Sequence, residues 1–525
     1  MKKIYHYTVV FLITIFVSCE AEKKETPPNI IYILMDDLGY GDVQPFNSES
    51  KIKTPHLSQL AQDGMIFTDA HTSSSVCTPT RYGIMTGRYN WRSGLKSWVL
   101  GGSSQALIPK ERSTVANVLK NNNYTTGFIG KWHLGWNWST KDTAYRTDDS
   151  LIKRIDYDHI DFTKKISHSP NDLGFDYAFG HSGSLDMPPY VYVENEITTD
   201  KVDSIGSSPS INNWNRDGPI ADNFIFDEVT PHFFEKAADF ISESSKKNKP
   251  FFLYLPIPAP HAPIVPTSEW VGKSGLNLYA DFVMQMDHHV GELVSKIDEL
   301  GITENTMIVF TSDNGCWWIA DFDFLESKGH SPSGIFRGEK ADIFEGGHRV
   351  PFIVKWPKKI KKGSVSDETI CTTDFYATCA DIVAMKMQDN EGEDSFSMVP
   401  LFDQSTAQNF KRENTIHHSG QGYFSIRKDN YKFIFFKGGG GYGNREVKNL
   451  DELPKFQLYD LEKDPAETNN LYGQYPDLEK ELIATFKNVV SNGRSTVGKV
   501  QKNMTTSTIG SKRSWNPLAV FDPER

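Results

Sequence analysis

The run Asn29-Ile30-Ile31-Tyr32-Ile33-Leu34-Met35-Asp36-Asp37 sets the fold class of this 525-residue chain. Its apolar part predicts a buried strand at 29–34, which is followed by two acidic side chains. Residues 250–256 and 306–311 repeat this pattern of an apolar run followed by polar residues. Between them, apolar side chains recur every three or four positions over 278–297, the spacing of an amphipathic helix. Strands that alternate with helices predict an α/β fold.

The pattern of the sequence changes at about residue 390. Aromatic-rich segments at 423–427 and 432–436 predict strands, and residues 477–490 predict a helix. We therefore expect a main domain over residues 29–389 and a smaller C-terminal α+β domain with an antiparallel sheet over 390–525.

The composition excludes some classes of protein. With 38% hydrophobic residues, a chain of this length can bury a large core. Its net charge of −11 comes without a long basic run, so we expect no nucleic acid partner.

The N-terminus indicates export. Met1-Lys2-Lys3 precedes an apolar stretch at 9–17, which is typical of a signal peptide over residues 1–18. Val17-Ser18-Cys19 resembles a bacterial lipobox, which implies a lipid on Cys19 and an anchor in a Gram-negative outer membrane, on its periplasmic or surface side. Residues 19–28 would then form a tether. The alternative is ordinary secretion with Cys19 removed.

The segment Val76-Cys77-Thr78-Pro79-Thr80-Arg81 has the features of a helix start. Thr78 followed by Pro79 predicts an N-cap and a first helical residue, so Cys77 is expected just before the helix. Free amides at a helix start attract anions, and Arg81 adds a fork of donors, so a sulfate or phosphate group suits this place. Taken alone, the segment is better explained as a buried free cysteine beside a cap.

Cys77-Thr78-Pro79-Thr80-Arg81, with Thr86-Gly87-Arg88 after it, matches the Cys-x-Pro-x-Arg signature of the type I sulfatases. The resemblance covers nearly all of the mature chain. It implies an alkaline-phosphatase-like fold, with a large, mixed, mainly parallel sheet between helices and a C-terminal domain that completes the substrate pocket. It also implies that a maturation enzyme converts Cys77 to Cα-formylglycine, whose hydrated aldehyde attacks sulfur.

The cysteine count agrees with a fold that depends on its core. If Cys19 carries lipid and Cys77 is modified, only Cys316, Cys371 and Cys379 are left, enough for at most one disulfide.

Asp36-Asp37 and Asp313-Asn314 each follow a predicted strand, where such residues are usually turns. Together they offer oxygen ligands that suit Ca²⁺ or Mg²⁺ and lack the histidine or cysteine that zinc prefers. The resemblance assigns these four residues, together with residue 77, to one calcium ion.

Further motifs match the sulfatase pattern. In Gly130-Lys131-Trp132-His133, an extended chain directs Lys131 and His133 to one face. The resemblance implies that Lys131 and Arg81 stabilise the sulfate oxygens and that His133 takes a proton from formylglycine. It also implies contact of His261 with the leaving-group oxygen and sulfate binding by Lys340.

Two segments match less closely. Phe179-Gly180-His181-Ser182-Gly183-Ser184-Leu185-Asp186 lies where sulfatases carry a substrate-binding residue, which makes Ser184 and His181 candidates, although a plain loop is an equal alternative. His417 could close the pocket, and a core or surface role is an equal alternative.

These features predict an exported sulfatase that removes sulfate from carbohydrates, such as oligosaccharides of algal ulvan, carrageenan or fucan, or of glycosaminoglycans. One rival is a formylglycine-dependent phosphonate monoester or phosphodiester hydrolase. Another is a non-catalytic glycan-binding lipoprotein, suggested by Trp214, Trp317 and Trp318.

Overall fold

The computed structural model describes residues 1, 3, 26–142, 154–210, 215–442, 450–504 and 517–521. Its main feature is a sheet with the strand order β13-β2-β12-β11-β1-β10-β4-β5-β6-β7. The middle strands run parallel, and they are β11 (Thr306–Ser312), β1 (Asn29–Asp36), β10 (Phe251–Pro260), β4 (Thr125–Lys131) and β5 (Tyr177–His181). Cys19, Trp214 and all of the predicted signal peptide except residues 1 and 3 lie outside the described residues.

The two edges make the sheet mixed. On one side, β12 (Phe352–Lys355) is antiparallel to β11 and to β2 (Met65–Phe67), and β13 (Ser364–Ser366) pairs with β2. On the other side, β6 (Val193–Glu194) and β7 (Ile197–Thr198) form an antiparallel end. A mixed, mainly parallel sheet is therefore confirmed.

Strand β1 is buried on both faces because its side chains alternate between two apolar clusters. Ile30, Tyr32 and Leu34 join one cluster, and Ile31, Ile33 and Met35 join the other. The first face packs against α2 (Cys77–Thr86), α3 (Val115–Asn121) and α8 (Phe375–Ile382). The second packs against α1 (Pro55–Asp63), α4 (Val229–Ser245) and α5 (Leu278–Glu299).

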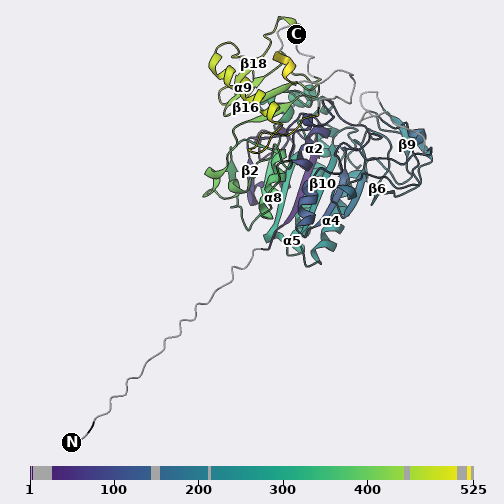
Figure 1. Ribbon diagram of the computed structural model, residues 1–525. Coiled ribbons are helices and arrows are strands. Elements are labelled where there is room, and N and C mark those ends of the chain that lie inside the picture. Colours follow the sequence, from purple (N-terminus) through teal and green to yellow (C-terminus); the bar gives the residue numbers. More distant parts are fainter. Residues whose placement is uncertain are drawn as a thin grey trace.

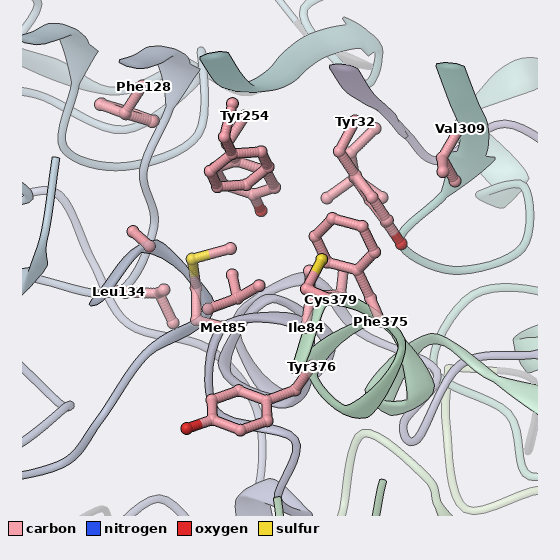
Figure 2. Packing of buried hydrophobic residues seen from close by; sticks show 14 of the residues in the cluster. Tyr32, Ile84, Met85, Phe128, Leu134, Tyr254, Val309, Phe375, Tyr376 and Cys379 are labelled. Carbon is pink, nitrogen blue, oxygen red and sulfur yellow. The ribbon is translucent and has the colours of Figure 1, made fainter. Parts of the chain in front are cut away.

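Aromatic rings fill the space between the sheet and α2 and α8. Figure 2 shows Tyr32 and Tyr254 of the sheet above Ile84, Met85 and Phe375 of these helices. The Tyr32 and Phe375 ring centroids are 4.4 Å apart. Contacts of this kind hold α2, and with it Cys77, at a fixed height over the sheet.

The C-terminal part carries a second, antiparallel sheet in the order β15-β16-β17-β18. Its strands are β15 (Thr415–His418), β16 (Phe424–Lys428), β17 (Tyr431–Ile434) and β18 (Gln457–Asp460). Helix α9 (Pro476–Asn492) packs on this sheet through Leu482 and Phe486. Figure 1 shows this unit at one end of the larger domain. Because Met398 and Phe402 still pack in the cluster around α8, the boundary at residue 390 stays a prediction.

The described residues also form four further short strands and two short α-helices. They are β3 (Ala70–His71) with β14 (Ile370–Cys371), β8 (Ser204–Ser207) with β9 (Asp217–Ile220), α6 (Phe322–Ser327) and α7 (Glu345–His348). Of the helices described, none combines the length and apolar character needed to cross a membrane. The cysteines at positions 77, 316, 371 and 379 are all buried and free.

Several polar side chains stand at the carboxyl ends of the parallel strands. Asp36 ends β1, Lys131 ends β4 and His181 ends β5. His261 follows β10, and Asp313 follows β11. Ligands of open parallel sheets bind at this edge.

Candidate active site

Four of the five predicted metal ligands, Asp36, Asp37, Asp313 and Asn314, converge at this edge. The backbone amide of Asp37 donates to Asp313 Oδ1 at 3.3 Å, and Asn314 Nδ2 donates to Asp37 Oδ1 at 2.6 Å. The four side chains, including Asp36, are at most 1% exposed. Two turns that are 277 residues apart in sequence thus form one buried acidic cluster.

The cluster has the character of a cation site. Burial raises the pKa of Asp37 to about 7, with Lys340 opposing the shift and Asp36 and Asp313 adding to it. Burial and the charge of Asp36 also raise the pKa of Asp313. Asn314 Oδ1 is buried without a hydrogen-bond partner among the described residues. Crowded carboxylates and an unused amide oxygen are the hard donors that calcium or magnesium accepts, so the residues fit such an ion.

Cys77 is the first residue of α2 and faces this cluster. Its Sγ lies 3.4 Å from Asp36 Oδ1. Burial raises the pKa of the Cys77 thiol well above its usual value, and the charges of Asp313 and Asp36 add to the shift. The thiol is therefore protonated at neutral pH and lacks the nucleophilicity of a thiolate.

The predicted cap of α2 is wrong in register. The helix begins at Cys77 with Val76 as its N-cap, so Thr78 and Pro79 lie inside the first turn. The Thr78 hydroxyl is used for tertiary contacts instead, because it donates to the His133 carbonyl at 2.9 Å and accepts from the Leu100 amide at 3.2 Å. Thr78 thus ties the helix start to two neighbouring loops, which propensity alone does not reveal.

Arg81 joins two of the strand ends. Its Nε and one terminal nitrogen donate to Asp313 Oδ2 at 3.0 and 2.7 Å, and the other terminal nitrogen donates to the Lys131 carbonyl at 2.9 Å. The same guanidinium lies 3.5 Å from Asp36. A completely buried arginine with these partners is a fixed positive charge beside Cys77.

Lys131 connects the acidic cluster to the loop after β5. Its ammonium group contacts Asp36 and donates to Ser184 Oγ at 2.5 Å. Ser184 Oγ in turn lies 3.4 Å from His261 Nε2. His261 Nδ1 lies 2.5 Å from the Ala262 carbonyl oxygen, which fixes the proton on Nδ1 and leaves Nε2 facing the site.

Lys340 closes the opposite side of the cluster. Its ammonium nitrogen lies 2.6 Å from Asp37 Oδ1 and 2.8 Å from Asp37 Oδ2. Burial opposes the charge, yet Asp37 and Cys77 hold the pKa of Lys340 well above its usual value. Arg81, Lys131 and Lys340 therefore surround Cys77 with positive charge.

His133 is a buried, neutral imidazole. Burial, Lys131 and Arg81 hold its pKa well below the usual value. Its Nε2 lies 2.8 Å from the Leu100 carbonyl oxygen and so carries the proton. Its Nδ1 is buried without a partner among the described residues, which leaves a bare nitrogen able to accept a proton.

Two candidates differ in what they contact. His181 pairs in register with Lys131, but its ring stacks on Phe233 at 5.7 Å, and burial lowers its pKa to about 3. Ser184, which contacts Lys131 directly, is the better placed of the pair. His417 lies in a separate buried cluster, where its ring stacks on His348 at 4.2 Å. That position does not support the predicted role of His417 in closing the pocket.

Sequence reasoning gave no role to Asp186. This carboxylate is 2% exposed, and its Oδ1 has no hydrogen-bond partner among the described residues. It lies two positions after Ser184. Its position so close to Ser184 was the available signal.

Known sulfatases are similar to this chain over most of its length. Residues 28–385 match the sequence model named Sulfatase, and residues 334–494 match that of the N-sulphoglucosamine sulphohydrolase C-terminal region. The chain is similar to N-acetylgalactosamine-6-O-sulfatase of Bacteroides thetaiotaomicron, with 32% identity over 88% of this chain and 93% of the relative. It is also similar to arylsulfatase A of Homo sapiens, with 30% identity over 88% of this chain and 86% of the relative.

Solved structures share the fold. One, from a study of the metabolism of multiple glycosaminoglycans by Bacteroides thetaiotaomicron, has a TM-score of 0.75 and 29% identity, covering 89% of this chain and 99% of that chain. Ps i-CgsB in complex with k-i-k-neocarrahexaose has a TM-score of 0.67 and 24% identity, and the match covers 91% of this chain and 95% of that chain. The phosphonate monoester hydrolase of Agrobacterium radiobacter, at 16% identity and a TM-score of 0.54, covers 89% and 96%.

Proposed function

This chain belongs to the sulfatase family and hydrolyses sulfate esters, and we propose that its substrate is a sulfated carbohydrate and its nucleophile is derived from Cys77. The observation that carries the proposal is the position of Cys77. Its Sγ is 3.4 Å from Asp36 Oδ1, and Arg81, Lys131 and Lys340 pair with the carboxylates of the same cluster.

The sulfate group would bind between the three cations. Arg81 donates to the carbonyl of Lys131 at the end of β4, and Lys340 pairs with Asp37. Fixed donors aimed at oxygens that gain charge in the transition state stabilise it strongly. Asp36, Asp37, Asp313 and Asn314 would hold a calcium ion, which when bound polarises the sulfate and orients the nucleophile.

Cys77 would be oxidised by a maturation enzyme to Cα-formylglycine, whose hydrate supplies a hydroxyl for attack on sulfur and a second hydroxyl for the release of sulfate. His133 suits the removal of the proton from that second hydroxyl, because its Nδ1 is bare and its Nε2 proton is held by the Leu100 carbonyl. The burial of His133 also keeps water away from this step.

The leaving alcohol would depart between His261 and Lys340. His261 Nε2 lies 3.6 Å from Asp37 Oδ2, and Lys340 contacts both oxygens of the same carboxylate. Because His261 carries its proton on Nδ1, its Nε2 is an acceptor. It can take a hydrogen bond from a hydroxyl of the leaving alcohol, but it cannot donate to the ester oxygen. Lys340 carries the positive charge and is the better donor to the departing oxygen.

The carbohydrate substrate is supported by the similarity to N-acetylgalactosamine-6-O-sulfatase. N-acetylgalactosamine 6-sulfate is therefore the first substrate to assay, followed by oligosaccharides of glycosaminoglycans and of algal ulvan, carrageenan and fucan.

Cys77→Ala tests the nucleophile. The protein is produced with a formylglycine-generating enzyme, the tryptic peptide of residue 77 is weighed by mass spectrometry, and sulfate release is measured by ion chromatography. We expect an aldehyde mass in the wild type and a loss of activity of at least about a thousandfold in the variant. Cys379→Ala is the matched control, since this buried cysteine packs in the core beneath the sheet. An unmodified thiol together with full activity of Cys77→Ala contradicts the proposal.

We also propose that the protein is exported and carries lipid on Cys19, on the basis of the residues Val17-Ser18-Cys19. Labelling of cells with a fatty-acid probe should mark the wild type and not Cys19→Ala. Equal labelling of the two proteins refutes the lipid anchor.

A further inference from the structure

A tryptophan stands directly against two groups of the active site. The Trp317 ring centroid is 5.3 Å from that of His261, and the Lys340 ammonium nitrogen is 4.8 Å from the same ring. Trp317 is only half-buried, although it follows the buried Asp313-Asn314-Gly315-Cys316. Its Nε1 is buried and has no hydrogen-bond partner among the described residues. The ring therefore borders the side where the leaving alcohol departs and also offers an unused donor.

Other aromatic rings continue this surface. The ring centroid of Tyr442 lies 6.0 Å from that of Trp317, and the ring centroid of Trp98 lies 5.2 Å from that of Tyr442. On the other side, Trp318 lies 6.0 Å from Trp317. We call Trp98, Tyr442, Trp317 and Trp318 the aromatic wall. The loop of Trp98 is anchored, because its backbone amide donates to the Gly420 carbonyl at 2.7 Å.

A hollow of about 480 Å³ begins where the wall ends at Trp318. Trp318 and Ala262, the residue after His261, both line it, together with Asn277, Tyr279 and Asp321. Its lining mixes apolar surface with amide, hydroxyl and carboxylate groups, as binding sites for polar organic ligands do. The hollow thus adjoins the active site at two consecutive pairs of residues, His261-Ala262 and Trp317-Trp318.

An unused acceptor lies on the Ser184 side of the site. Asp186 Oδ1 is buried without a partner among the described residues, and Oδ2 is 3.5 Å from the guanidinium of Arg216. Burial raises the pKa of Asp186, while the charges of Arg216, Lys131 and Lys340 oppose the shift. Buried polar atoms without partners are costly, so a ligand hydroxyl is the natural partner for this oxygen.

We propose that the aromatic wall is the saccharide-binding surface: the sugar that carries the sulfate packs its C–H face on Trp317, and the next sugar of the chain lies on Trp318 in the hollow. The inference rests on the carbohydrate substrate proposed above. A flat ring supplies contact area at little entropic cost, and the polar atoms of Trp317 Nε1 and Asp186 supply hydrogen bonds to hydroxyls. An aryl or steroid ester would use the ring surface but would leave both polar atoms without partners.

Substitution of Trp317 and of Trp318 should change KM in ways that depend differently on the length of the substrate. Trp317→Ala should raise KM about tenfold for both a sulfated monosaccharide and a sulfated oligosaccharide. Trp318→Ala should raise KM about tenfold for the oligosaccharide and leave the monosaccharide within about twofold. The probes are N-acetylgalactosamine 6-sulfate and a defined chondroitin 6-sulfate tetrasaccharide, with released sulfate as the readout.

Inhibition by inorganic sulfate separates sugar binding from damage to the sulfate site. Its inhibition constant reports the sulfate site and not the sugar-binding surface, so both variants should keep it within about twofold of the wild type. A parallel rise of the sulfate inhibition constant in Trp317→Ala overturns the inference, because Trp317 would then merely support Lys340. Trp317→Phe, which keeps a ring and lacks the N–H, should lie between Trp317→Ala and the wild type.

The remaining outcomes are distinct. If the wild type cleaves an aryl sulfate and neither saccharide nor any other sulfated glycan, the carbohydrate substrate itself is wrong. If the wild type cleaves a saccharide and both tryptophan variants match it in KM, only the role of the aromatic wall is refuted. If Trp318→Ala weakens both substrates equally, the assignment of the hollow to the second sugar is wrong.

Discussion

Each cation of the active site has a different carboxylate as its nearest acidic partner. Arg81 pairs with Asp313, Lys131 with Asp36 and Lys340 with Asp37. Arg81 differs from the two lysines because its planar fork also reaches the Lys131 carbonyl. A lysine ammonium is a point charge and cannot span both partners.

Arg81→Lys should therefore lower kcat/KM by about a hundredfold to a thousandfold although the formal charge is unchanged. Initial rates on a sulfate ester measure this effect. Arg88→Lys is the control, since Arg88 pairs with Glu393 at 3.1 Å and donates to the Lys502 carbonyl. Equal kcat/KM of Arg81→Lys and the wild type would show that charge alone is needed at position 81.

His71, His348 and His417 form a buried cluster away from the active site, and hydrogen bonds within the protein account for it. Lys432 lies 3.1 Å from His348 Nε2, His348 Nδ1 is 3.1 Å from His71 Nδ1, and His71 Nε2 is 2.7 Å from Asp69. With both imidazoles neutral, Lys432 can donate to His348 Nε2, His348 Nδ1 can donate to His71 Nδ1, and His71 Nε2 can donate to Asp69. The rings of His348 and His417 are within 8° of parallel, so they cannot both direct a lone pair at one ion lying in their planes. We assign the cluster to packing between the two sheets.

At the scale of single elements, α2 depends on both of its ends. It begins at Cys77, and Gly87 ends it with φ 61° while donating to the Gly83 carbonyl at 2.8 Å. A Cβ on Gly87 would lie 2.8 Å from Tyr376 Cβ and 2.9 Å from Gly392 Cα. The end of α2 thus needs glycine for its backbone conformation and also for the close approach of α8.

Gly87→Ala should destabilise the protein more than Gly301→Ala. Gly301 also has a positive φ, 68°, but a Cβ there meets nothing within 4 Å, so only the backbone strain of about 1 kcal/mol applies. The clash at Gly87 should add about 1 to 3 kcal/mol. Urea unfolding of both variants measures the difference, and equal midpoints would show that the contact with α8 relaxes freely.

At the scale of the whole molecule, a buried ionic cluster joins the two sheets' domains. Lys432 of β17 lies 3.0 Å from Glu345 of α7 and 2.9 Å from Glu467. The backbone amide of Glu345 donates to Glu467 Oε2 at 2.6 Å. Burial raises the pKa of Glu467 from 4.5 to about 7, with Lys432 opposing the shift and Glu345 adding to it.

This shift gives a pH dependence of stability with a definite sign. Between pH 4.5 and 7 the folded protein holds a proton on Glu467 that the unfolded chain releases, so this group's contribution to stability falls as pH rises, by about 3 kcal/mol at most. Glu467→Gln abolishes the titration. Its Tm relative to the wild type should therefore increase from pH 5 to pH 8.

Thermal unfolding at several pH values measures this difference. Glu462→Gln is the control, because Glu462 is exposed and should follow the wild type throughout. A constant Tm difference between Glu467→Gln and the wild type across this range would show that Glu467 is already ionised at pH 5.

Features that depend on neighbouring residues could be predicted from the sequence, and features that depend on tertiary contacts could not. The strands at 29–34, 250–256 and 306–311 and the helix at 278–297 were predicted because burial imposes a short period on apolar residues. The register of α2 was wrong because the Thr78 hydroxyl bonds to the His133 carbonyl, a tertiary partner invisible to local rules. His417 lies against His348 in a buried cluster, and the core role was one of the alternatives that the sequence left open. No local pattern shows which buried side chains a histidine contacts.

The sequence by itself determined the α/β class, the oxygen-rich ligand pairs after two strands and the sulfatase signature at Cys77, because each is written in neighbouring residues. Only the tertiary structure decided that Ser184, rather than His181, contacts Lys131, and that Trp317 lies against both His261 and Lys340. These contacts join segments far apart in the chain, and they depend on how the sheet aligns its strand ends and how the helices pack on it. Strand periodicity fixes which faces are buried, whereas side-chain partners across the site follow from packing in three dimensions.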